Sequence, residues 1–211
     1  MSEAHACVVP ESGVVAIVPA AGSSRRMGTD KLLLEWEDTV VLGSVLDALE
    51  GGGAEPVLVV ASPRNRRLRA WIADRGASSA VNPRPERGML SSVLAGLEAL
   101  GGAERVAARA SGLLVCPGDH AGLEPASVRS LCDALDAGAP LAVPVYRRRR
   151  GHPLAIAAGL IREIPGLDYG VGLRQLVARH ESDLVEIPVD DPAVVRDLDT
   201  PDEYRDTLER D

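Results

Sequence analysis

Two kinds of segment alternate along the chain. Continuous apolar runs rich in β-branched residues predict strands buried on both faces, as in a parallel sheet covered by helices. Apolar stripes at helical spacing lie between these runs and predict helices. The predicted strands are Val14–Ala20, 57–61, 113–116 and 141–145, and the stripes cover 41–49, 93–100 and 128–135.

This alternation predicts a doubly wound α/β sheet. The last third is less regular: 154–156 and 184–189 are typical of strands, and 172–180 of a helix. A final helix is expected near Pro201, with Thr200 as its N-cap. The simplest organisation is an N-terminal tail, 1–12, followed by a single domain, 13–211.

Composition narrows the function classes. A net charge of −8 over 211 residues argues against nonspecific nucleic-acid binding. No apolar run reaches the roughly 20 residues of a membrane span, and residues 1–12 lack the basic flank of a signal peptide. Cys7, Cys116 and Cys132 show no metal or redox spacing, which favours a reducing cytoplasm. Lys31 is the single lysine among 23 cationic residues, a hint that a compact ammonium is needed there.

The segment from Val18 to Lys31 has the composition of an anion-binding loop. It leaves a predicted strand through glycines and serines that can present backbone N–H groups to phosphate, and it ends in cationic residues. It has neither the Gly-Lys-Ser/Thr ending of a P-loop nor the dinucleotide fingerprint. An ordinary strand-to-helix turn with solvated arginines is the alternative.

Five ordered motifs carry a family resemblance. Ala20-Ala21-Gly22-Ser23-Ser24-Arg25-Arg26-Met27-Gly28, followed by Lys31, resembles the signature loop of the molybdenum cofactor cytidylyltransferases and their guanylyltransferase relatives. The other motifs lie at Asn82-Pro83 with Gly88-Met89, Ser91-Ser92 and Ala95-Gly96-Leu97; at Pro117-Gly118-Asp119; at Gly151-His152-Pro153; and at Asp197-Leu198-Asp199-Thr200-Pro201.

The resemblance implies a single-domain, Rossmann-like fold of the glycosyltransferase-A type, a three-layer sandwich with a mixed, mainly parallel sheet. It implies Mg²⁺-dependent transfer of a nucleotidyl group from a triphosphate to a phosphate-bearing acceptor, with release of pyrophosphate. The implied catalytic residues are Arg25, Lys31 and Asp119, and His152 is a candidate for the acceptor site. The implied nucleotide-binding residues are Ala20, Ala21, Gly22, Ser23, Ser24, Arg25, Lys31, Asn82, Gly88 and Ser92.

Carboxylates supply the expected metal ligands. Asp119 follows a predicted strand, at the sheet edge where open α/β folds bind ligands, and a carboxylate there suits Mg²⁺. A helix-capping role is the alternative for this aspartate. Asp197 and Asp199 would share one face of an extended segment. We favour Asp199 as the second ligand, with a charge at the start of the last helix as its alternative role.

Several alternatives stay open. The Ala-Ala-Gly start resembles the cytidylyl branch of the family, which implies CTP and not GTP as the donor. Thr29-Asp30-Lys31-Leu32 favours the molybdenum cofactor branch, and hence molybdopterin as the acceptor. The Val18-Pro19 opening also resembles the enzymes that make cytidylyl-methylerythritol, and a non-catalytic molybdenum cofactor chaperone is a rival of another class. His120 and Ala121-Gly122 depart from the family pattern, which obscures the acceptor side. The run Arg147–Arg150 is a solvated turn or an attractor for an anionic acceptor.

Overall fold

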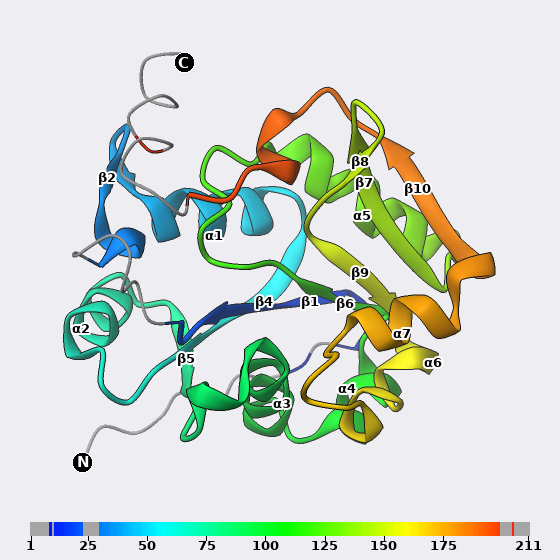
Figure 1. Cartoon of the computed structure of the whole chain (residues 1–211), viewed down its shortest axis with the longest axis horizontal. Helices are drawn as coiled ribbons and strands as arrows, with labels where there is room; N and C mark the ends of the chain where they lie inside the picture. The colour runs from blue at the N-terminus through cyan, green and yellow to red at the C-terminus, as the bar shows by residue number, and fades with distance from the viewer. Residues whose placement is uncertain (1–8, 10, 23–29, 199–203, 205–211) are drawn as a thin grey trace.

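The computed structural model describes residues 9, 11–22, 30–198 and 204, and its centre is one sheet with helices on both faces (Figure 1). The strand order is β10-β7-β9-β6-β1-β4-β5, with the short β8 paired to β7. The strands of this sheet are β1 (Val14–Ala20), β4 (Ala54–Ala61), β5 (Ser78–Val81), β6 (Gly112–Val115), β7 (Leu141–Tyr146), β8 (Arg149–Arg150), β9 (Leu154–Ala157) and β10 (Leu184–Pro188). A separate hairpin joins β2 (Glu35–Trp36) to β3 (Thr39–Val40), and the helices are α1 (Val41–Gly51), α2 (Arg66–Asp74), α3 (Met89–Ala99), α4 (Ala103–Arg109), α5 (Pro125–Asp136), α6 (Ala158–Ile161) and α7 (Arg174–Arg179).

The sheet is mixed and mainly parallel, as expected. β1 lies at its centre and runs parallel to both β4 and β6. β9 runs antiparallel to its neighbours β6 and β7, whereas β10 is parallel to β7. The chain leaves β1 toward β4 on one side and returns to β6 on the other. The carboxyl end of β1 is therefore a point where the direction of winding reverses, the usual ligand position in such sheets.

Alternating side chains of β1 build the two cores. Ala16 and Val18 belong to the core cluster that contains α1 and α5, whereas Val15 and Ile17 belong to the cluster that contains α3 and α4. Figure 1 shows these helix pairs on opposite faces of the sheet, which confirms the three-layer arrangement. A strand buried on both faces needs apolar residues at every position, and for this reason the apolar run predicted β1 with its observed bounds.

One residue of the segment expected to be an N-terminal tail packs against the domain. Val9 is fully buried in the second core cluster, and Arg109 Nε donates to its carbonyl at 3.1 Å. The domain boundary at residue 13 stays a prediction. The predicted helix at Pro201 lies outside the described residues.

The described cysteines are free and buried, as expected for Cys116 and Cys132. Burial raises the pKa of both thiols, that of Cys132 to about 11, so both are protonated near neutral pH. Cys7 lies outside the described residues. Across the residues that the structure describes, none of the helices has the length and apolarity to cross a membrane.

Helix α3 approaches β1 through a glycine, which generates a prediction. A Cβ at Gly96 would lie 2.9 Å from the Ile17 side chain. We expect Gly96→Val to lower the free energy of unfolding by about 1–3 kcal/mol through overpacking, measured by urea denaturation. Gly159→Val is the matched control, because a Cβ at Gly159 meets no atom within 4 Å. Equal losses in the two variants would contradict a close packing role for Gly96.

Candidate active site

Backbone pairing between β1 and the end of β6 positions Asp119. Beyond β6, Cys116 N–H donates to the Ile17 carbonyl at 3.2 Å, and Gly118 N–H donates to the Pro19 carbonyl at 3.3 Å. The chain therefore follows β1 to its carboxyl end before it turns away. Asp119 follows this paired segment and lies beside the start of the Gly-rich loop, at the sheet edge where it was expected.

Lys31 meets Asp119 at this end of the sheet. Lys31 begins the short helix η1 (Lys31–Leu33), and its Nζ lies 2.5 Å from Asp119 Oδ2. The two side chains are only 15% and 18% exposed, so their charges are poorly screened by solvent. The other carboxylate oxygen, Asp119 Oδ1, is buried and has no hydrogen-bond partner in the described structure. A buried carboxylate oxygen without a donor is suited to a cation.

His120 adds a nitrogen donor that the sequence analysis treated only as a departure from the family. Its side chain is 1% exposed, and Nδ1 lies 3.1 Å from the Ala193 carbonyl oxygen. A carbonyl only accepts, so Nδ1 carries a proton, and in the neutral ring Nε2 has the lone pair. Nε2 lies 3.0 Å from Asp197 Oδ1 but is not aligned for a hydrogen bond.

Asp119, His120 and Asp197 form one cluster. Each offers a ligand atom, and these atoms lie within 4.8 Å of one another. Burial lowers the pKa of His120, but the Asp197 carboxylate and the Ala193 carbonyl raise it, and the net shift is upward. The same contact lowers the pKa of Asp197. Two carboxylates and an imidazole fit a divalent cation, which would take the Nε2 lone pair in place of a proton. Asp199 lies outside the described residues, so its place as second ligand stays a prediction.

The turn that carries the Ala193 carbonyl is itself fixed by a buried acid. Asp191 is 1% exposed, and its carboxylate accepts from the Ala193 N–H at 2.9 Å and from the Glu124 N–H at 3.0 Å. This carboxylate ties the helix η5 (Pro192–Val195) to the loop that follows Asp119. The orientation of His120 thus depends on a segment distant in sequence.

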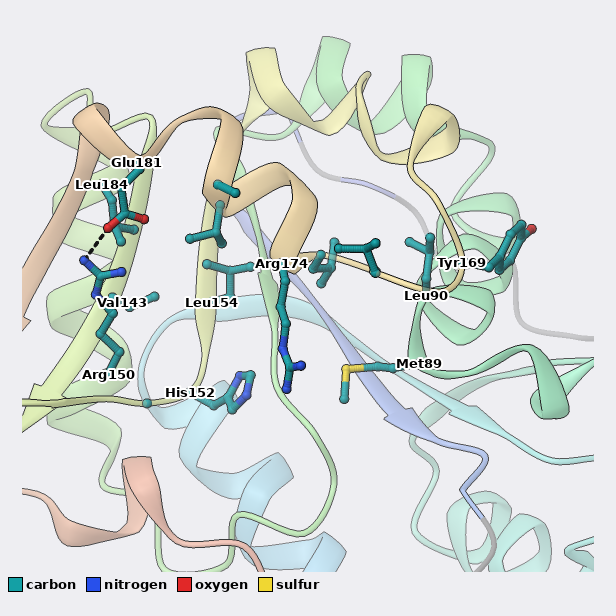
Figure 2. Close-up of a pocket in the computed structure, with 16 residues that line it drawn as sticks. Met89, Leu90, Val143, Arg150, His152, Leu154, Tyr169, Arg174, Glu181 and Leu184 are labelled. Atoms are coloured by element: carbon teal, nitrogen blue, oxygen red, sulfur yellow. Dashed lines mark hydrogen bonds and ion pairs between the residues drawn. The ribbon is translucent and has the colours of Figure 1, made fainter.

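His152 lies next to this cluster and contacts one of its members, His120. Its ring and that of His120 are in edge-to-face contact, with centroids 5.0 Å apart. Burial lowers the pKa of His152 to about 4, and the neighbouring His120 acts in the same direction. His152 is therefore neutral near pH 7. It also lines a cavity, whose side chains are drawn in Figure 2.

The second motif forms an internal hydrogen-bond network. Asn82 is 1% exposed, and its amide donates to Ser91 Oγ at 2.7 Å and to Ser92 Oγ at 3.0 Å. Its carbonyl oxygen accepts from the Arg84 N–H at 2.9 Å. Gly88 has φ of 85°, a conformation that favours glycine. These residues shape the turn before α3, and direct contact of Asn82, Gly88 and Ser92 with a nucleotide stays a prediction.

The start of the Gly-rich loop is only partly described. Ala20 and Ala21 are buried at the end of β1, and Gly22 is exposed with no atom near the position of a Cβ. Ser23, Ser24 and Arg25, with Arg26, Met27 and Gly28, lie outside the described residues. Their contacts with a triphosphate stay predictions.

The run Arg147–Arg150 forms a hairpin turn, at Arg147 and Arg148, and the strand β8 that follows it. Arg147 and Arg148 have positive φ, and Arg149 donates to the Val195 carbonyl at 3.3 Å. Arg150 donates to Glu181 at 2.7 Å and to Glu186 at 2.6 Å. Two carboxylates thus neutralise the charge of Arg150. Arg149 and Arg150 connect the hairpin to the segments that carry Val195, Glu181 and Glu186.

The α/β fold, with the acidic cluster at the carboxyl end of β1, is typical of proteins that transfer nucleotidyl groups. The sequence profile of the MobA-like NTP transferase domain family matches residues 16–184, and the chain belongs to that family. The molybdenum cofactor cytidylyltransferase of Escherichia coli K12 is 26% identical over 201 residues, which cover 94% of this chain and 97% of that protein.

Solved structures share this fold. The crystal structure of Rv0371c from Mycobacterium tuberculosis H37Rv has a TM-score of 0.78 and 32% identity, covering 94% of this chain and 98% of that chain. A complex of Rv0371c with manganese has a TM-score of 0.73 and 29% identity, covering 93% and 98%.

A close backbone approach at the Gly-His-Pro motif yields a second prediction. A Cβ at Gly151 would lie 2.1 Å from the Val194 carbonyl oxygen, which accepts from the His152 N–H at 2.7 Å. We expect Gly151→Ala to displace η5, to lower stability by about 1–3 kcal/mol, and to weaken Mn²⁺ binding because His120 loses its support. Thermal unfolding and Mn²⁺ titration would measure these effects. Gly166→Ala, with no atom within 4 Å, should behave as wild type; unchanged Mn²⁺ affinity in Gly151→Ala would refute the link.

Proposed function

We propose that this protein transfers CMP from CTP to the phosphate of a molybdopterin-type molybdenum cofactor and releases pyrophosphate. The observation that carries the proposal is the convergence of Lys31 and Asp119, with Nζ and Oδ2 2.5 Å apart, at the carboxyl end of β1. The residues come from the two motifs that the chemistry needs most, separated by much of the sequence. The cytidylyltransferase name of the Escherichia coli relative supports the choice of nucleotide and acceptor.

The reaction needs a single displacement. An oxygen of the acceptor phosphate attacks the α-phosphorus in line, the bond from that phosphorus to the bridging oxygen breaks, and pyrophosphate leaves with the electron pair. Catalysis of this kind comes from positioning and from balancing negative charge. Lys31, together with Arg25 of the Gly-rich loop, would hold the triphosphate and the departing pyrophosphate. No covalent bond to the protein forms.

The described acids fit a divalent cation, and we propose Mg²⁺ as the ion used in turnover. Asp119 Oδ1, His120 Nε2 and Asp197 would hold it, because the first two atoms are buried and have no hydrogen-bond partner among the described residues. When bound, the ion would draw acceptor and donor phosphates together and neutralise their charge. An imidazole ligand adds affinity for Mn²⁺, which accepts nitrogen more readily than Mg²⁺ does. The manganese complex of Rv0371c supports a metal role in this group of proteins.

Pyrophosphate release tests the proposal directly. We expect release with CTP and molybdopterin, and little with ATP, GTP or UTP under the same conditions. If release is faster with GTP, the donor in the proposal is wrong and GTP takes the place of CTP. If CTP reacts only with another phosphorylated acceptor, molybdopterin is not the substrate. Tight molybdopterin binding without release from any triphosphate would instead favour a cofactor chaperone.

Asp119→Asn separates catalysis from folding. The substitution keeps the shape and one acceptor oxygen but removes the charge that faces Lys31 and the cation site. We expect turnover to fall by at least about a hundredfold, with a thermal midpoint close to that of wild type, measured by pyrophosphate release and differential scanning calorimetry. A collapse of the midpoint together with activity would mean that Asp119 is a structural residue.

His120→Asn tests the nitrogen ligand. We expect the Mn²⁺ affinity to fall about tenfold while the Mg²⁺ affinity changes little, measured by electron paramagnetic resonance and competition. His180→Asn is the matched control, since His180 is remote and contacts Glu163 at 2.9 Å. In the wild-type complex, pulsed resonance should detect a coupled imidazole nitrogen. Absence of that coupling would exclude His120 from the metal, whatever the variant does.

A further inference from the structure

A cavity of about 540 Å³ is lined in part by His152, whose ring contacts His120 of the acidic cluster. Its walls come from the start of α3, from β7 and β9, and from the segment that leads into α7. The volume lies within the range of pockets for small organic molecules, roughly 300–1,000 Å³. Figure 2 shows Met89 and Arg174 reaching toward His152 from different elements, with Arg150 and Glu181 at the opposite end.

Exposed apolar side chains gather at this cavity. Met89 is 47% exposed, Tyr169 39% and Val171 52%, and all three line it. They are three of the five large apolar side chains that are exposed among the described residues. Tyr169 is one of only five aromatic residues in the whole sequence. Clustered exposed apolar residues around a cavity indicate a binding site.

The two arginines that line the cavity differ in whether a carboxylate pairs with them. Arg150 is paired with Glu181 and Glu186, whereas Arg174 has no hydrogen bond or ion pair with any residue that the structure describes. The guanidinium of Arg174 points toward His152 in Figure 2. The ring of His152 in turn contacts that of His120, a member of the acidic cluster. An uncompensated guanidinium recognises phosphate or carboxylate through paired N–H groups.

We infer that this cavity binds the acceptor, a flat ring compound that carries a phosphate. Arg174 holds the phosphate where it faces the nucleotide, and the rings lie against Met89, Tyr169 and Val171. The Arg150–Glu181 pair offers a donor and an acceptor to the polar edge of the heterocycle. His152, which lines the cavity and contacts His120, lies between this cavity and the acidic cluster. The inference rests on the proposed function and adds the residues that select its acceptor.

Arg174→Gln tests the phosphate contact, with Arg179→Gln as the matched control on the same helix. Arg179 lies 3.7 Å from Glu163 and does not line the cavity. At saturating CTP, we expect Arg174→Gln to raise the KM for molybdopterin about tenfold and to leave the KM for CTP within about twofold. Arg179→Gln should leave both constants unchanged. Equal molybdopterin constants in the two variants, or a selective loss of CTP binding in Arg174→Gln, would overturn the assignment.

Direct binding of molybdopterin without nucleotide, followed by its fluorescence, separates this inference from the proposed function. If the wild type binds molybdopterin and Arg174→Gln binds it about tenfold more weakly, the cavity assignment stands even where no pyrophosphate is released. If turnover is intact and neither Arg174→Gln nor Val171→Asp weakens binding, the cavity assignment fails and the proposed function survives. A wild type that binds no molybdopterin overturns both.

Discussion

The parallel alignment of β1 with β6 and its extension is the constraint on which the site depends. Because Gly118 N–H still donates to the Pro19 carbonyl, the chain cannot diverge before Asp119 reaches the level of the Gly-rich loop. Lys31 returns to the same level on the other side of that loop, and the two charges meet. Backbone hydrogen bonds with β1 thus position Asp119, whereas the short helix η1 carries Lys31.

Much of this could be predicted from sequence. β1 and β6 are buried on both faces, so their apolar runs have no polar interruption, and the residues that follow them were placed correctly at one edge. The stripe that predicted α1 is the buried face of that helix. The resemblance supplied the order of the motifs and hence the mixed sheet. The motifs predicted that Lys31 and Asp119 share one site, and the structure brings the two side chains into contact. Their catalytic roles stay predictions.

Other elements give weak signals for identifiable reasons. α2 buries only Leu68 and Ile72 among arginines and polar residues, and β5 is a short edge strand of small, half-exposed side chains. The roles of His120 and Asp197 depend on the meeting of two loops, which no local pattern encodes. Similarly, nothing in the sequence around Asn82 and Ser92 predicts that the two buried side chains are hydrogen-bonded to each other. The burial of Val9 likewise arises from tertiary packing against α4 and cannot be deduced from its neighbours in sequence.

The position of Asp191 has a consequence for how such a centre can diversify. Its single carboxylate anchors the turn that orients His120, yet it belongs to a surface connection after β10 and not to the sheet. Exchange of that connection would alter the donor set around Asp119 without disturbing any strand. The orientation of the His120 imidazole beside Asp119 therefore depends on a connecting segment that lies outside the sheet.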